Sequence, residues 1–423
     1  MKLKTNVLMI LILLCLLVMT LLSSMIYKSR VIEERRQAEI IAEQERLAEE
    51  ERQRILAGPD TYKGTVSGED VPAEVMNVIT EYLDLHFRSM YRLEMQDDSA
   101  LFAREYYQTI SKCSTELIVE TRKAYDFDFK MHDAHYDLNV TDYYTDGEYY
   151  YVTLTEDDYF SFNFLEDIES STYDVYTTYR IINDNGTYKI YSMYKEQGFY
   201  IMFYDETETV EELQSIYDFY LSKNKDLIAY EKTMKETAAT TGYTSTRTFT
   251  NSYNRDAAVA YADQYFNTRN PDWYNFDEIG GNCQNYASQA ILAGGIPMDY
   301  TGAGQWKCYG ASSTVMPEID NSENASGRTA SWVNVNYFYE YAINNTGYGM
   351  AAENVLNIFF AEPGDIIQVS YNDANNMAHT TIVSKVVDGH ALVDSNSIDM
   401  KDYPIEAYVY PYRRLIKILG YNQ

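Results

Sequence analysis

One cysteine lies in a sequence context that could make its sulfur a nucleophile. Gly280 and Gly281 lead into Cys283, and apolar residues follow at helical spacing until Gly294-Gly295 ends the predicted helix. The cysteine therefore falls on or just before the first turn, where unpaired backbone N–H groups and the helix dipole favour a thiolate. The glycines before it let backbone and substrate approach closely. The alternative is that Cys283 is a small buried hydrophobic residue, as most free cysteines are.

A nucleophilic cysteine needs a base, and the last part of the chain offers two histidines. A hairpin distinguishes them, because Asp388-Gly389 is a strong signal for a two-residue turn between strands at residues 379–387 and 390–396. The strands begin with His379 and His390 respectively. His390 lies beside the turn, whereas His379 lies at the open end of the hairpin. We therefore take His379 as the candidate base.

The register of this hairpin predicts which residue orients the base. An unbroken register from the turn places Thr381 opposite Asn396, so that His379 and Asn396 share a face as diagonal neighbours within reach of each other. Asp394 lies on the same face one pair further away and is the second choice. A slip of one residue would move Asn396 to the other face. The predicted triad is Cys283, His379 and Asn396.

Cysteine at a helix start, then histidine at a strand start, then asparagine on the next strand is the order found in papain-like hydrolases. In this chemistry Cys283 attacks an amide carbon, His379 takes and returns the proton, and water hydrolyses the thioester. The backbone N–H of Cys283 is the first candidate for an oxyanion donor, and the Asn282 side chain is a possible second one. We expect no metal and no cofactor, because no Cys/His spacing fits a zinc site.

The C-terminal region resembles a known family, the putative amidase domain of Gram-positive bacteria. The matching blocks cover roughly the last 170 residues in the family's order: Tyr253-Asn254-Arg255-Asp256-Ala257-Ala258 with Tyr261-Ala262, Asn270-Pro271, Gly280 to Gln289, Gly294-Gly295, Ser331-Trp332, Pro363-Gly364-Asp365-Ile366-Ile367, and His379 with Ile382-Val383. The resemblance implies a papain-like fold, related to cysteine, histidine-dependent amidohydrolase and peptidase domains that cut peptidoglycan. It also implies an α+β segment before the amidase region.

Two positions depart from the pattern of this family. The family usually has Asp before the cysteine, where this chain has Asn282. Near the C-terminus it tends to show His-Thr-x-Asp, where this chain has Asn396-Ser397-Ile398-Asp399. If the family histidine orients the base, Asn396 replaces it with a residue that papain-like enzymes use. The substrate does not follow from the family.

Composition narrows the classes of partner and the number of domains. A length of 423 residues with 46% hydrophobic residues predicts two or three domains with substantial cores. A net charge of -30 argues against nucleic acid as a partner, because nucleic-acid binding needs a basic surface. Of the four cysteines, three lie outside the apolar N-terminal segment, so at least one thiol is unpaired.

Residues 1–27 are expected to anchor the chain in a membrane. Residues 6–27 are almost wholly apolar, and about 20 such residues span a bilayer. We favour an uncleaved signal anchor over a cleaved signal peptide, because the apolar run is long and Ser23-Ser24 fits a cleavage site poorly. The short N-terminal flank favours a single-pass protein with its C-terminal domains outside the cytoplasm.

Residues 28–58 are charged and rich in strong helix formers, which predicts a helical stalk. Their broken heptad favours a solvated helix over a dimeric coiled coil, so that self-association through the stalk is a weak alternative. Residues 60–236 predict an α+β accessory domain, a Thr-rich linker follows at 237–252, and 253–423 form the amidase region. The accessory domain shows helical periodicity at 71–95, 100–124 and 208–236 and alternating strands at 135–141, 148–154, 172–182 and 188–194.

Two helices against a curved antiparallel sheet resemble the nuclear-transport-factor-like cone. The fold class is therefore α+β, with a membrane helix, a stalk, a cone domain and a papain-like domain. Two functions remain open. The first is a membrane-anchored extracytoplasmic cysteine amidohydrolase or peptidase that cleaves an amide bond in cell-wall peptide. The second is a catalytically inactive papain-like module used for binding, or as a scaffold, in a cell-surface assembly.

Overall fold

The computed structural model describes residues 64–202, 206–302 and 304–423, together with residues 19, 28, 30–32, 35–38, 40–44 and 46–47. The chain divides into two compact units, Met1–Ala57 and Gly58–Gln423. In the first unit every described residue from 28 to 47 is helical, and the exposed side chains of Glu43 and Arg46 form an ion pair of 2.6 Å.

The structure contradicts the predicted membrane-spanning helix. Residues 1–27, where that helix was expected, lie outside the described residues except for Met19. Among the residues that the structure describes, no helix is both long enough and apolar enough to cross a bilayer. The longest of them, Val210–Thr240, carries charged residues along its whole length. The α+β class therefore stands without a membrane helix, and the membrane location that depended on this helix is corrected with it.

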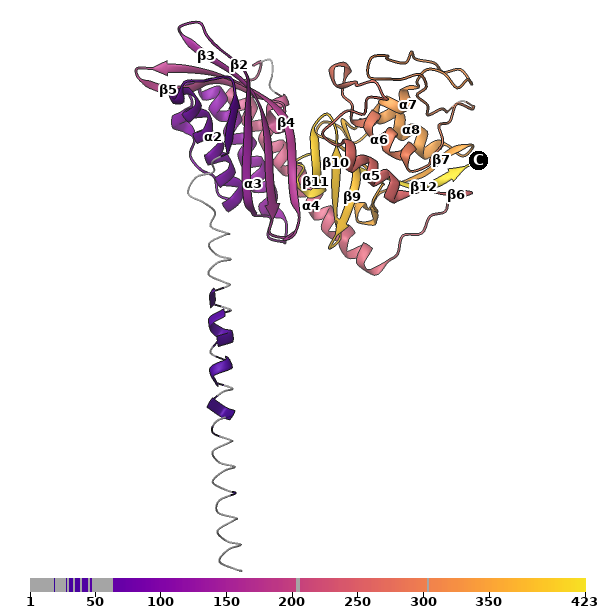
Figure 1. Ribbon diagram of the computed structural model, residues 1–423, viewed down its shortest axis with the longest axis horizontal. Coiled ribbons are helices and arrows are strands. Elements are labelled where there is room, and N and C mark those ends of the chain that lie inside the picture. The colour runs from indigo at the N-terminus through magenta and orange to yellow at the C-terminus, as the bar shows by residue number, and fades with distance from the viewer. Residues whose placement is uncertain are drawn as a thin grey trace, which may run out of the picture. The chain divides into compact units, whose positions relative to one another are not determined.

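Helices and long antiparallel strands form the first part of the unit Gly58–Gln423 (Figure 1). The helices α2 and α3 lie where the sequence predicts them, and the 3-10 turn η1 (Ser99–Leu101) precedes α3. Side chains of β3 alternate between buried and half-buried, so one face of the sheet is covered. The bounds are β1 (Thr65–Gly68), α2 (Ala73–Arg92), α3 (Glu105–Ala124), β2 (Met131–Thr145), β3 (Tyr149–Phe162), β4 (Glu169–Asp184) and β5 (Thr187–Lys195).

Helix α4 (Val210–Thr240) joins the two parts of this unit. Thr209 and Glu212 form a capping box at its start, in which each side chain bonds to the other residue's backbone N–H. The helix continues to Thr240, past the predicted end at residue 236. Its Asn224 side chain donates to the carbonyl of Val409 at 3.0 Å, so the helix contacts the C-terminal part as well as α3.

The C-terminal part contains four helices among its described residues, α5 (Arg255–Tyr265), α6 (Cys283–Ala293), α7 (Ala330–Val333) and α8 (Val335–Asn344). Asn334 separates α7 from α8, because its side chain caps α8 by accepting the N–H groups of Asn336 and Tyr337. The strands are β6 (Asn251–Ser252), β7 (Gly349–Val355), β8 (Ile366–Ser370), β9 (His379–Val387), β10 (His390–Ser395), β11 (Asp399–Pro404) and β12 (Tyr412–Asn422).

The described strands form one continuous sheet through the unit. Its order is β1-β2-β3-β4-β11-β10-β9-β8-β12-β6, with β5 on β4 and β7 on β12. The two parts meet where β11 pairs with β4, for example Asp399 with Tyr173. Figure 1 shows the strands of the two parts meeting at this junction.

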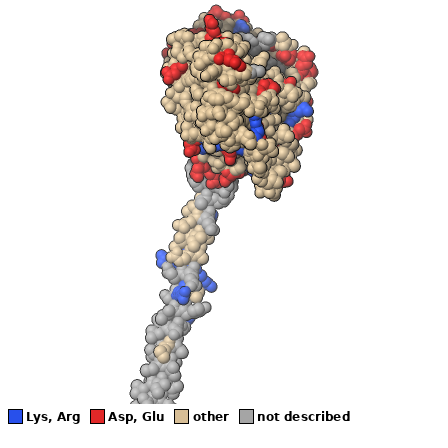
Figure 2. All heavy atoms as spheres, turned by 90° about the vertical axis from the view of Figure 1, so that its right-hand side faces the viewer, with Lys and Arg blue, Asp and Glu red and all other residues tan. Residues whose placement is uncertain are grey.

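The C-terminal strands have a hydrophobic core on each face. Ile366 and Ile382 pack with helix α6 in one core. Ile367 and Val383 point the other way, into a core shared with the first part of the unit. Accordingly β8 is buried along its whole length, and β9 is buried from His379 to Ser384. On the face shown in Figure 2, acidic side chains are spread more widely than basic ones, in line with the net charge of -30.

Candidate active site

Helix α6 places Cys283 at its first residue, directly after Asn282. Gly280 and Gly281 have φ angles of 94° and 101°, a region that residues with a Cβ rarely adopt. A Cβ on Gly281 would lie 3.7 Å from the Ser397 hydroxyl, so the loop passes close to the segment after β10. The glycines thus shape the turn that presents Cys283, as the sequence predicted.

The thiol of Cys283 is buried, with 7% of the residue exposed. Burial raises its pKa, although the N–H groups of Thr380, Gln284 and Cys283 itself act in the opposite direction. The sequence predicted that the helix start would favour a thiolate. In the structure burial outweighs the helix start, because few polar groups replace the water that a thiolate would need.

His379 is the first residue of β9 and lies next to Thr380, whose N–H faces the sulfur of Cys283. Its side chain is buried, and its Nε2 has no hydrogen-bond partner. Burial lowers the pKa of His379 to about 4, so the imidazole is neutral near pH 7. Its ring centroid lies 6.5 Å from that of Tyr408. Within the described part of the chain, no hydrogen bond joins His379 to Cys283 or to Asn396.

A β-bulge in the β9–β10 hairpin changes the predicted register. His390 pairs with Val387 beside the turn, as expected. The register then shifts between Leu392 and Val393, so that Asp394 pairs with Ile382 instead of Val383. Continuing this register places Asn396 opposite Thr380, on the face away from His379. The geometric reason for choosing Asn396 as the orienting residue is therefore lost.

Asn396 instead joins the loop before Cys283 to the end of helix α5. Its Oδ1 accepts a hydrogen bond of 2.7 Å from Nδ2 of Asn282. Its Nδ2 donates to the carbonyls of Tyr265 and Phe266, both at 3.0 Å. Helix α5 ends at Tyr265, so these carbonyls lack partners within the helix. The structure thus brings together Asn282 and Asn396, both fully or almost fully buried.

Asn282 makes further hydrogen bonds within the loop before Cys283. Its Oδ1 accepts from the N–H of Phe276 at 3.2 Å and from Nδ2 of Asn285 at 2.8 Å. Its backbone N–H donates to the hydroxyl of Ser397. Its Nδ2 has two N–H bonds, and one of them is donated to Asn396, which ties the side chain to the loop network. The backbone N–H of Cys283 stays the first candidate for the oxyanion donor.

Asp394, the second choice for orienting the base, is buried away from His379. Its Oδ1 accepts the N–H of Asp402 at 2.9 Å, and its Oδ2 has no partner. Burial raises its pKa to about 7. It shares its face with Ile382, which packs against helix α6, and no hydrogen bond between described residues links it to His379.

The sequence analysis did not predict a network of ion pairs beside the loop before Cys283. Arg269 bonds Asp277 at 2.6 Å and both carboxylate oxygens of Asp399 at 3.0 Å. Ser397 donates to Asp277 at 2.7 Å, and its N–H donates to Asp399 at 2.9 Å. Burial raises the pKa of Asp399 to about 6 against the opposing effect of Arg269. Arg269 and Asp277 lie more than 100 residues before Ser397 and Asp399 in the sequence, and no local pattern links the two segments.

A second missed network fixes the contact between α6 and the sheet. The Gln284 Oε1 accepts from the Thr380 hydroxyl at 2.9 Å and from Gln368 at 3.4 Å. The Gln368 Oε1 accepts from Arg414 at 2.7 Å. These buried side chains hold the residue after Cys283 against the residue after His379. The network therefore fixes the backbone spacing of the two candidate catalytic residues.

Comparison with known proteins finds a family model that matches this region. Residues 252–419 match the family model described as "Putative amidase domain". The resemblance predicted from the sequence is thereby confirmed, and the family supports an amidase-type hydrolase activity. A curated relative, "Uncharacterized protein YhbB" of Bacillus subtilis (strain 168), is 30% identical over 153 residues, which cover 35% of this chain and 43% of the relative. The match thus spans less than half of that protein. No solved structure matches this chain.

The hydrogen bond between Asn282 and Asn396 joins the two positions at which the sequence departs from the family pattern. They stand where the family usually has Asp and His, and in this structure their side chains bond to each other. The two amide side chains form this hydrogen bond without placing a charge on either residue.

Proposed function

We propose that the C-terminal region, residues 253–423, is a cysteine-dependent amidase or peptidase that uses Cys283 and His379. The observation that carries the proposal is the placement of Cys283 at the start of a buried helix, with its sulfur against the N–H of the residue after His379. The family match of the same region supports it.

The proposed reaction uses the protonation states favoured by the structure. His379 is neutral near pH 7 and can accept the thiol proton, so that the sulfur of Cys283 adds to the amide carbon as the C–N bond breaks. The protonated His379 returns the proton to the leaving amine. Water then hydrolyses the thioester, with His379 again as base. The first proton transfer requires the imidazole of His379 to turn toward the sulfur of Cys283 when substrate binds. Such a change is common, because catalytic contacts are often looser in the free enzyme.

We assign Asn396 to the support of the Cys283 loop. Its hydrogen bonds to Asn282 and to the carbonyls of Tyr265, Phe266 and Thr268 favour this role over the orientation of His379. We further propose an amide bond in cell-wall peptide as the substrate. The resemblance of the family to domains that cut peptidoglycan supports this choice.

A second candidate function is a binding module without catalysis. It is favoured by the pKa shifts of Cys283 and His379, which both favour the neutral form, and by the missing hydrogen bond between these two described residues. In that case the amidase region would recognise a peptide without cleaving it.

Digestion of purified muropeptides with the full chain separates the two functions. We expect release of new amino termini by the unchanged protein, and a loss of at least 100-fold in Cys283→Ala and His379→Ala, the scale of positioned acid–base catalysis. Cys308→Ala is the matched control, because this thiol is also free and buried but lies in the core. Equal hydrolysis by Cys283→Ala contradicts the proposal. Saturable binding without hydrolysis by any form supports the binding module.

A further inference from the structure

A cavity of about 100 Å³ lies inside the first part of the unit Gly58–Gln423. Its walls come from helices α2 and α3 and strands β3 to β5, and the segment 398–410 closes one side. Neither Cys283 nor His379 is among the described residues that line it. Tyr408 does line it, and the same side chain lies beside His379. The cavity is therefore separate from the candidate active site, and the side chain of Tyr408 borders both.

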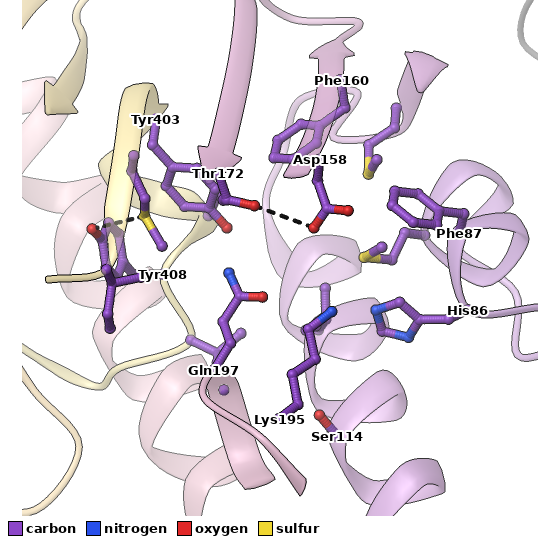
Figure 3. Close-up of a pocket in the computed structure, with 18 of the residues that line it drawn as sticks. His86, Phe87, Ser114, Asp158, Phe160, Thr172, Lys195, Gln197, Tyr403 and Tyr408 are labelled. Atoms are coloured by element: carbon purple, nitrogen blue, oxygen red, sulfur yellow. Dashed lines mark hydrogen bonds between the residues drawn. The ribbon is translucent and has the colours of Figure 1, made fainter. Parts of the chain in front are cut away.

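Much of the wall is apolar. Phe87, Met90, Met131 and Phe160 line the cavity and are buried in the surrounding core. Figure 3 shows Phe87 and Phe160 on one side, with Tyr403 and Tyr408 across from His86 and Phe87. Such a lining favours a hydrocarbon group over a hydrated inorganic ion.

Arg122 brings to this wall a positive charge that lies over the rings of Phe129 and Phe162, at 5.4 and 5.0 Å from their centroids, without a carboxylate partner among the described residues. The residue is 4% exposed and lines the cavity. One of its nitrogens donates to the sulfur of Met131 at 3.2 Å, the hydroxyl of Tyr403 is its other polar neighbour, and its Nε has no partner. Among the described residues no carboxylate pairs with it. A guanidinium is always charged in proteins, and a buried charge without a counter-ion is costly.

Among the described residues, the other ionisable groups of the wall form no ion pair with Arg122. Lys195 donates to Glu156 at 2.9 Å, and the two charges cancel. Burial, followed by the charge of Glu156, raises the pKa of Asp158 well above its usual range, which favours the neutral form of its carboxyl. Burial lowers the pKa of His86 to about 3, so this ring is neutral too. Of the two cationic side chains, Lys195 has a carboxylate partner and Arg122 has none among the described residues.

Lys195 also has donors to spare. An ammonium group has three N–H bonds, and one of them is used by Glu156. Figure 3 shows Lys195 and Asp158 both pointing toward the middle of the cavity, from β5 and β3 respectively. The Asp158 carboxyl accepts from Thr172 at 3.2 Å. An anionic head group would thus meet two cationic side chains beside the Asp158 carboxyl.

We propose that this cavity binds a small organic monocarboxylate, with its carboxylate against Arg122 and Lys195 and its hydrocarbon part against the aromatic and methionine side chains. A cavity of about 100 Å³ fits a short chain, since a dry apolar cavity of about 150 Å³ holds benzene. The inference is independent of the chemistry at Cys283.

Isothermal titration of the full chain with three matched probes tests this proposal. The probes are butyrate, 1-butanol and n-butylamine, which share a four-carbon body and differ in charge. We expect saturable binding of butyrate, binding of 1-butanol at least tenfold weaker, and none of n-butylamine. From acetate to butyrate each added methylene should tighten binding about fourfold. Equal affinity for butyrate and 1-butanol, or for butyrate and chloride, overturns the proposal.

Variants of Arg122 provide the second arm of the test. Arg122→Met should weaken butyrate binding at least tenfold and raise the melting temperature of the unliganded protein, because an unpaired buried charge is removed. Arg122→Lys keeps the charge and should retain binding. Arg104→Met is the matched control, because Arg104 pairs with Glu206 on the same part of the chain and does not line the cavity. Unchanged binding in Arg122→Met contradicts the proposal.

Should Arg122→Met fail to fold, a cavity-filling variant carries the same test. Ser114 lines the cavity from α3, and Ser114→Met adds volume without changing charge. We expect it to abolish butyrate binding while the circular dichroism spectrum stays the same. Full butyrate affinity in a folded Ser114→Met protein contradicts the site.

Discussion

Replacement of Asn396 by alanine should destabilise the fold without changing the ionisation of the candidate catalytic pair. The side chain is fully buried and makes hydrogen bonds of 2.7, 3.0 and 3.0 Å to Asn282, Tyr265 and Phe266. Truncation leaves one buried N–H and two buried carbonyls without these partners. Each such group costs about 1–3 kcal/mol, so we expect a loss of about 3–5 kcal/mol in the free energy of unfolding.

Urea unfolding of the full chain measures this loss, and a double-mutant cycle with Asn282→Ala isolates the bond between the two amides. The coupling free energy should be about 1 kcal/mol or more, since the two groups are buried and in direct contact. Asn344→Ala is the control. This exposed side chain bonds only to Glu340 of its own helix, and its loss should change the free energy of unfolding by less than about 0.5 kcal/mol.

The same variant distinguishes support of the loop from orientation of His379. If Asn396 only supports the loop, the pH dependence of Cys283 alkylation by iodoacetamide should be the same in Asn396→Ala and in the unchanged protein. A stability loss below about 1 kcal/mol, together with a shifted pH profile, would refute the reasoning and restore Asn396 as the orienting residue.

Two further predictions follow from buried charges. Glu231→Gln leaves Arg413 unpaired, and because both side chains are under 5% exposed it should cost about 3–5 kcal/mol in urea unfolding. Lys232→Met breaks the exposed pair with Asp126 and should cost less than about 1 kcal/mol; equal costs would contradict the argument. The pKa of His379 falls from 6.5 to about 4 on folding, so below pH 6.5 the unfolded state binds the extra proton. Between pH 6.5 and 4 the unchanged protein should therefore lose about 3 kcal/mol more stability than His379→Gln, and parallel stability curves would rule out a buried neutral histidine.

The local signals in the sequence predicted the elements on which Cys283 and His379 lie. Gly280-Gly281 and the apolar spacing after Cys283 predicted the start of α6, and Asp388-Gly389 predicted the two hairpin strands at their observed first residues. These features depend on turn geometry and helical periodicity, which short stretches of sequence encode.

The partner of His379 could not be predicted in the same way. The bulge lies between Leu392 and Val393, where neither Gly nor Pro marks a change of register. The hydroxyl of Ser384 donates both to the carbonyl of Leu392 and to Asp402, a residue of the next strand. Such a shift depends on contacts between strands, and a single sequence does not reveal them.

The same limit applies to the sheet as a whole. Strand β11 (Asp399–Pro404) has charged residues and a proline, so its composition does not suggest a strand. It forms because it lies between β10 and β4, and β4 comes from more than 200 residues earlier in the chain. The burial of Cys283, which raises its pKa, is likewise a product of this packing and not of the helix start alone.

Trapping of an acyl group on Cys283 tests the central claim most directly. The full chain is mixed with a peptide substrate, quenched in acid within milliseconds and analysed by intact and peptide mass spectrometry. We predict an added mass equal to the acyl part of the substrate on Cys283, and none in Cys283→Ala. Turnover of the substrate with no adduct on Cys283, or an adduct that persists in Cys283→Ala, would contradict the account.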